Sequence, residues 1–224
     1  MPLLRKNGVA LLFVHVPKTG GTSVENAFRD AGWDVDMLSR RAARGTENWY
    51  RRCSPQHLHA ADLADTLRLE RIDASFCFVR EPRRRLISEY VWRHRTSETI
   101  DTHSHAFEAW TTKVFRESAA DPYTGDNHIR PQVEFVLPTT HVFRLEDSLE
   151  AGMARLAELT GVDVPTDMPR AQEASRATGI TAADVDVTEL AAEQITAFYR
   201  EDYRQFGYDV PGTGAAPAQP RWRR

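Results

Sequence analysis

The chain has 224 residues, of which 41% are hydrophobic, and this is enough for a single domain with a buried core. Its formal net charge of −3 excludes a general attraction to nucleic acid or to an anionic membrane surface. Its two cysteines lack C-x-x-C spacing, which excludes a disulfide framework and a cysteine-based zinc site.

The N-terminal segment, residues 1–8, leads directly into an apolar run and lacks the arrangement of a signal peptide. No apolar run in the sequence approaches the roughly 18 residues that a membrane-spanning helix needs. We therefore expect a cytoplasmic protein without a membrane span.

A short apolar strand that ends in a small, polar, cationic loop comes next. Residues 9–16 are rich in β-branched side chains, which is typical of a strand buried on both faces of an α/β sheet. The glycines after it allow a tight turn, the hydroxyls can cap the following helix, and the helix amides together with a lysine favour a phosphate-like anion. An ordinary strand-to-helix turn with a solvated lysine is the alternative. The loop contains Lys18, Thr19, Gly20, Gly21, Thr22 and Ser23.

The order of these loop residues differs from a Walker A motif, because Lys18 precedes the glycines instead of following them. The pattern P-K-T-G-G-T-S resembles the 5′-phosphosulfate loop of sulfotransferases that use 3′-phosphoadenosine 5′-phosphosulfate (PAPS). The resemblance is closest to the branch of the heparan sulfate 2-O-sulfotransferases and related bacterial enzymes. It implies that residues 18–23 bind the 5′-phosphosulfate of the donor.

A weak alternation over residues 33–38 predicts a second strand or an edge strand. The basic segment 39–52 follows without a clear period. Its Arg40 and Arg41 are typical of a solvated face, whereas its Trp49 and Tyr50 fit either core anchors or an acceptor surface.

Two histidines, His57 and His59, precede a predicted helix over residues 60–69. Their spacing does not place them on one helix face, so we expect them at or before the helix start. The second lies 21 residues before Arg80, and the resembling branch carries an H-x-H pair at nearly the same distance before its nucleotide-binding arginine. The resemblance implies His59 as the catalytic base and His57 as its neighbour. Because Leu58 replaces the usual glycine of that branch, either histidine fits the role, and two exposed turn histidines are the alternative.

A second buried strand, residues 73–79, is predicted to end on Arg80. Pro82 suits the first turn of the helix that we expect over residues 83–95. Arg80 at the strand end and Ser88 two turns into the helix can converge on one anion, through a planar guanidinium and a hydroxyl.

The sequence F-V-R-E-P-x-x-x-L-I-S-x-Y over residues 78–90 resembles the second sulfotransferase motif, which binds the 3′-phosphate of PAPS. The resemblance implies that Arg80 and Ser88 bind this phosphate. Glu81 stands where many relatives have Asp. A helix in which Arg80 merely pairs with Glu81 is the alternative.

The segment 126–132 resembles the N-x-H-x-x-P-Q segment beside the acceptor cleft of carbohydrate sulfotransferases. It implies that His128, Arg130 and Gln132 bind the acceptor; a polar loop before an apolar run is the alternative. His103 and His105 lack a completing carboxylate or cysteine cluster, so we expect no metal site.

The remaining pattern predicts a strand over 141–145, a helix over 146–160, a loop over 162–187 and a final helix over 188–206. The ending Y-x-x-D-Y-x-x-F-G-Y is how the resembling branch commonly closes. We expect one domain over residues 1–210 and a disordered tail over 211–224.

The resemblance covers residues 8–208 and implies a P-loop-like α/β fold, with a central parallel sheet, helices on both faces and the cofactor at the carboxyl ends of the strands. It implies sulfuryl transfer from PAPS to a hydroxyl of a carbohydrate, glycolipid or small natural product, without a metal and without a nucleic-acid partner. A P-loop kinase or NTPase, and a non-catalytic module that binds nucleotide or sulfated glycan, are the alternatives. No pattern indicates an oligomeric state.

Overall fold

The computed structural model describes residues 1–39, 44–169 and 178–211. The chain separates into two compact units, each built from three segments. Unit 1 comprises Met1–Val79, Gly125–His128 and Glu134–Ala171, and unit 2 comprises Arg80–Thr124, Ile129–Val133 and Gln172–Arg224. The expected domain 1–210 spans both units, and the expected tail lies, apart from residue 211, outside the described residues.

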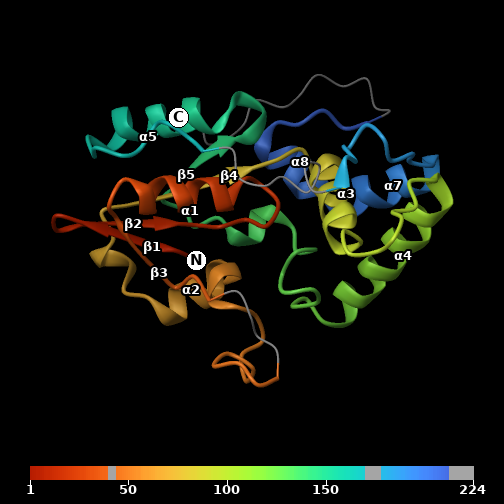
Figure 1. Ribbon diagram of the computed structural model, residues 1–224, viewed down its shortest axis with the longest axis horizontal. Coiled ribbons are helices and arrows are strands. Elements are labelled where there is room, and N and C mark those ends of the chain that lie inside the picture. Colours follow the sequence, from red (N-terminus) through yellow and green to blue (C-terminus); the bar gives the residue numbers. More distant parts are fainter. Residues whose placement is uncertain (40–43, 170–177, 212–224) are drawn as a thin grey trace. The chain divides into compact units, whose positions relative to one another are not determined.

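Unit 1 is organised around a sheet whose described strands follow the order β3-β1-β2-β4-β5 (Figure 1). β2 pairs with β4, and β4 with β5, in parallel, whereas β1 is antiparallel to both β2 and β3. All strands except β1 therefore point the same way, which confirms the predicted α/β class with a mostly parallel central sheet. The strands are β1 (Leu3–Lys6), β2 (Val9–Phe13), β3 (Asp34–Asp36), β4 (Ala74–Val79) and β5 (Thr140–Arg144).

The first strand corrects the expectation that residues 1–8 simply lead into the sheet. β1 forms a hairpin with β2, in which Leu3 pairs with Leu12 and Lys6 with Val9. The turn is Asn7-Gly8, and both residues have left-handed φ angles, of 51° and 84°. Asn-Gly is the preferred pair for a two-residue hairpin, because both positions need positive φ.

In the described part of unit 1, the helices that cover the sheet are α1 (Gly21–Asp30), α2 (Ala60–Thr66) and α5 (Leu149–Thr160). Leu11 and Phe13 of β2 face the same core as Phe28 of α1 and Met153 of α5, and all four are fully buried. Figure 1 shows α2 on the opposite side of the sheet from α1 and α5. Helices thus lie on both faces of the sheet, as predicted.

Unit 2 is helical in its described part. Phe115 of α4 stacks on Phe198 of α7 with ring centroids 4.1 Å apart. The predicted final helix, 188–206, is broken at Tyr199 into α7 and α8. The helices are α3 (Pro82–Arg93), α4 (Ser104–Ala120), α7 (Glu189–Phe198) and α8 (Arg200–Phe206).

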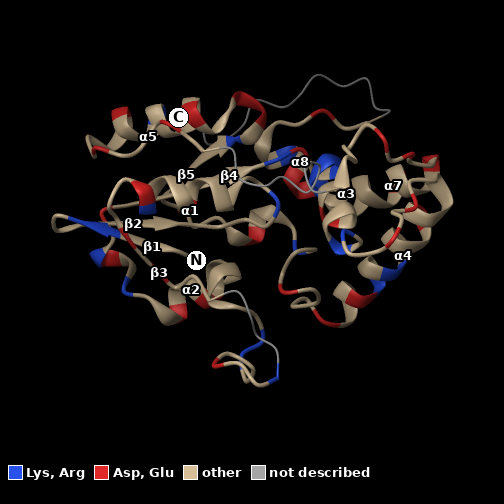
Figure 2. Ribbon diagram, in the orientation of Figure 1, with Lys and Arg blue, Asp and Glu red and all other residues tan. Residues whose placement is uncertain are grey.

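Charges are mixed along the outer helices. Figure 2 shows acidic and basic residues interspersed along α4 and along α5, so neither helix presents a surface of one sign. Among the described helices, none is both long enough and apolar enough to cross a membrane.

Candidate active site

Residues 17–23, which we call the anion loop, comprise the end of the connection between β2 and α1 and the first residues of α1. Gly20 is the N-cap residue of α1 with a φ of 88°, and Lys18 has a left-handed φ of 68°. A lysine in this conformation is strained, and such strain is often found in functional loops. The Thr19 hydroxyl donates to the Val16 carbonyl at 2.8 Å and closes the loop. The positive end of α1 and the Lys18 ammonium therefore belong to one short loop, which favours an anion.

Helix α1 begins at Gly21, two residues earlier than it would with Thr22 as its N-cap. Thr22 and Ser23 lie inside its first turn, and its N-cap, Gly20, makes no side-chain capping bond. The expectation that these hydroxyls cap the helix is therefore wrong, although Thr22 is exposed and its hydroxyl can reach a ligand.

The second glycine of the anion loop is required by packing against a buried histidine. A Cβ atom at Gly21 would lie 2.2 Å from Nε2 of His15, a distance that no real contact allows. His15 is buried, and its Nδ1 lies 2.6 Å from Oε1 of Glu25. Gln56 donates from Nε2 to the same Glu25 oxygen at 2.5 Å. His15, Glu25 and Gln56 thus form a buried group that packs against Gly21 of the anion loop. This group was not predicted, and its signal in the sequence was a histidine at the end of an apolar run.

His57 ends the 3₁₀ turn Pro55–His57 and is nearly enclosed, with 7% of its surface exposed. Its Nδ1 lies 2.8 Å from Oδ2 of Asp126, and its ring meets the His128 ring edge-on at 4.7 Å between centroids. Burial lowers the pKa of His57 to about 3, which outweighs the opposing hydrogen bond to Asp126. The ring is therefore neutral near pH 7, and Nδ1 is the atom that donates to the carboxylate.

His59 is the N-cap residue of α2, at the helix start as predicted. Its Nδ1 lies 2.6 Å from Oδ2 of Asp62, one turn into the same helix. The His59 side chain keeps 15% of its surface exposed, against 9% for His57. A carboxylate at Nδ1 orients the ring, which is the usual arrangement of a general base.

The turn at residues 125–128 brings His128 to His57 within unit 1. Asp126 and Asn127 have left-handed φ angles of 63° and 64°, and the Asn127 amide donates to the His57 carbonyl at 2.8 Å. Ser54 donates to Asp126 from its backbone nitrogen at 2.6 Å and from its hydroxyl at 2.8 Å. This pairing of distant segments was not predicted.

One donor atom each from His57, Asp126 and His128 lies within 4.8 Å of the others, and such a trio could hold a transition metal. Asp126, however, already accepts hydrogen bonds from Ser54 and from His57, and a metal ion would have to replace them. The arrangement is that of a histidine oriented by a carboxylate.

In unit 2, Arg80 directly follows Val79, the last residue of β4, so peptide continuity puts it at the carboxyl end of that strand. Glu81 is the N-cap of α3, and its carboxylate accepts from the amides of Arg83 at 3.0 Å and Arg84 at 2.7 Å. Ser88 lies in the second turn of α3 and is partly exposed, as is Arg80. Both residues occupy the positions that the motif predicts.

The position of Gln132 corrects the expectation that it faces the acceptor. Its side chain is fully buried, its Oε1 accepts from the Arg80 amide at 2.9 Å, and its Nε2 donates to the Arg80 carbonyl at 2.8 Å. Both ends of the amide are thus engaged by main chain. Arg130 is also buried, with its guanidinium 5.0 Å from the centre of the Tyr123 ring. A contact of His128 or Arg130 with an acceptor stays a prediction.

Trp49 and Tyr50 are not core anchors, because 58% and 72% of their surfaces are exposed. That these two aromatic residues form part of an acceptor surface stays a prediction. Arg40 and Arg41 lie outside the described residues.

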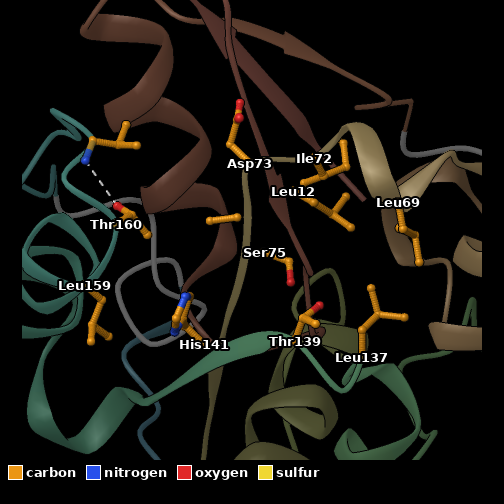
Figure 3. Close-up of a pocket in the computed structure, with 12 residues that line it drawn as sticks. Leu12, Leu69, Ile72, Asp73, Ser75, Leu137, Thr139, His141, Leu159 and Thr160 are labelled. Carbon is orange, nitrogen blue, oxygen red and sulfur yellow. Dashed lines mark hydrogen bonds between the residues drawn. The ribbon is translucent and has the colours of Figure 1, made fainter.

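Unit 1 also contains a cavity of 460 Å³, whose lining residues are drawn in Figure 3. Ala74 and Ser75 at the start of β4, and His141 near the start of β5, contribute to its lining. Leu12 of β2 also lines the cavity, but no residue of the anion loop does. The cavity is therefore separate from the candidate site.

A sequence model of the sulfotransferase family matches residues 3–209, a range that contains the anion loop and the Arg80 motif. No curated protein and no solved structure matches the chain at a significant level. The family match covers nearly the whole chain, and the motifs occur in the expected order at the ends of neighbouring parallel strands. The chain belongs to the sulfotransferase family.

Proposed function

We propose that the protein transfers the sulfuryl group of PAPS to a hydroxyl of a carbohydrate, a glycolipid or a small natural product. Membership of the sulfotransferase family supports sulfuryl transfer in general. The observation that carries the choice of donor is the anion loop, where Lys18 and the N-terminus of α1 combine with a glycine pair.

Charge neutralisation in this proposal comes from the protein. The amides at the start of α1 and the Lys18 ammonium bind the 5′-phosphosulfate and offset the negative charge that develops on the bridging oxygen. The guanidinium of Arg80 and the hydroxyl of Ser88 bind the 3′-phosphate. Because cationic groups and amides supply this charge, the reaction needs no metal ion.

The transfer is an in-line displacement. The acceptor oxygen forms a bond to sulfur while the bond between sulfur and the bridging oxygen breaks, and adenosine 3′,5′-bisphosphate leaves with that electron pair. The acceptor proton passes to Nε2 of His59, since Asp62 holds Nδ1 and the ring is more exposed than that of His57.

Incubation of the purified protein with radiolabelled PAPS and a panel of sugars, glycolipids and phenols tests this function. We expect label in an acceptor, with undiminished transfer in the presence of a metal chelator. Binding of adenosine 3′,5′-bisphosphate without transfer to any acceptor would favour a non-catalytic nucleotide-binding module. Uptake of ATP with magnesium, together with indifference to adenosine 3′,5′-bisphosphate, would overturn the proposal in favour of a kinase or NTPase.

A further inference from the structure

The main chain of Arg80 is held by a residue far away in the sequence. The side-chain amide of Gln132 accepts from the Arg80 nitrogen at 2.9 Å and donates to the Arg80 carbonyl at 2.8 Å. This pair of hydrogen bonds resembles the pairing that a neighbouring β-strand would provide, and it occurs just after β4 has ended. Gln132 thereby fixes both backbone groups of the residue that carries the guanidinium.

Gln132 is itself held in place by a carboxylate of α8. Asp202, which is fully buried, accepts from the Gln132 nitrogen at 2.9 Å and from the Val133 nitrogen at 3.0 Å. Both carboxylate oxygens are thus used to fix the backbone that presents the Gln132 amide.

Tyr203, the next residue of α8, contacts Glu81, which directly follows Arg80. The Tyr203 hydroxyl donates to Oε1 of Glu81 at 2.8 Å, and Glu81 both follows Arg80 and caps α3. Tyr199 supports the same region, because its hydroxyl donates to the Ile129 carbonyl at 2.8 Å. Asp202 and Tyr203 of the Y-x-x-D-Y ending therefore contact Gln132 and Glu81, the residues that hold and follow Arg80.

We propose that Gln132, Asp202 and Tyr203 are positioning residues that set the direction of the Arg80 guanidinium and so determine selectivity for a donor with a 3′-phosphate. The inference rests on the proposed function and extends it. A planar guanidinium binds a phosphate through two parallel hydrogen bonds only within a narrow range of angles, so a shift of its backbone weakens that contact specifically.

Calorimetry with adenosine 3′,5′-bisphosphate and adenosine 5′-monophosphate tests the inference, because the two ligands differ only by the 3′-phosphate. Gln132→Met keeps the side-chain length and removes both hydrogen bonds, and Tyr203→Phe removes only the hydroxyl that reaches Glu81. Thr112→Val is the control, since it also removes one hydroxyl, which donates to Oε1 of Gln194 at 3.1 Å and belongs to neither anion motif. All three substitutions lie in unit 2.

We expect the wild type to bind the bisphosphate more tightly than the monophosphate. Gln132→Met should lower the ratio of the two dissociation constants by about tenfold, and Tyr203→Phe should lower it less. Thr112→Val should keep the full preference. General destabilisation would weaken both ligands alike, so the ratio isolates positioning from stability. If Gln132→Met does not fold, the ratio in Tyr203→Phe decides.

An unchanged ratio in a folded variant, with the wild-type preference intact, would overturn the positioning role and leave the proposed function standing. A wild type that does not distinguish the two ligands would instead contradict the proposed donor site. The two failures are therefore separate outcomes of one experiment.

Discussion

The anion loop after β2 and Arg80 after β4 both follow the carboxyl end of a parallel strand, yet they are held in opposite ways. Several contacts of the anion loop join residues close in the sequence, such as Thr19 with Val16 and His15 with Glu25, although Gln56 also reaches Glu25. Arg80 is held by Gln132, which is 52 residues away in the chain, and its neighbour Glu81 by Tyr203, which is 122 residues away. A local anion site can thus be recognised from a short motif, whereas a site held by distant segments depends on contacts that no short motif contains.

The same contrast separates the two candidate bases, and it leads to the largest expected effect. Asp62 lies three residues from His59, whereas Asp126 lies 69 residues from His57. We expect His59→Ala to lower turnover by about 10²- to 10⁴-fold, because a positioned general base is lost, with donor binding retained. Steady-state kinetics and calorimetry on the same variant check this. Near-normal turnover would transfer the role of base to His57 or His128.

The two anion motifs should differ in which ligands they discriminate. We expect Arg80→Ala to weaken binding of adenosine 3′,5′-bisphosphate by about 10- to 100-fold and to leave adenosine 5′-monophosphate unchanged, because only the first carries a 3′-phosphate. Lys18→Ala should weaken both ligands, since both carry the 5′-phosphate. Calorimetric titrations measure these constants. Equal losses for the two ligands in Arg80→Ala would remove Arg80 from the 3′-phosphate site.

The local origin of the anion loop can be tested through Gly21. We expect Gly21→Ala to lower the free energy of unfolding by about 1–3 kcal/mol, because its Cβ would overlap the His15 ring. Urea unfolding measures the loss. In a His15→Ala background the same substitution should cost less, and the double-mutant cycle gives the coupling. Additive effects would show that the His15 ring is not what requires glycine.

The buried state of His57 gives the smallest expected effect, a dependence of stability on pH. Burial lowers its pKa from 6.5 to about 3, so between these values the unfolded chain binds a proton that the folded chain does not. Stability contributed by neutral His57 is therefore complete above pH 6.5 and is lost as pH falls, by about 1–2 kcal/mol between pH 7 and 5. Urea unfolding at the two pH values measures this. His57→Gln should flatten the dependence, and an equal slope in both proteins would contradict the assignment.

Features that depend on neighbouring residues could be predicted from the sequence. The apolar strands 9–16 and 73–79, the glycine pair before α1 and the proline at the start of α3 all correspond to observed elements. Asn7-Gly8 is also a hairpin signal in the sequence, although the hairpin was not predicted. Such features rest on backbone preference and hydrophobic period, which a short window contains.

The candidate site was only partly predictable. His57, His59, Arg80 and Ser88 were named from motifs, but their partners were not. Asp126 was not predicted as the partner of His57, because 69 residues separate the two. Gln132 was predicted at the acceptor, whereas its buried amide pairs with a backbone 52 residues away.

By itself, the sequence determined an α/β chain with two anion-binding motifs at the ends of buried strands, because strand period, glycine and helix-capping preferences are local properties. Only the tertiary structure decided that Asp126 orients His57 and that Gln132 holds Arg80. These depend on contacts between segments brought together by the burial of apolar faces, and the energy of such contacts does not appear in any single stretch of sequence.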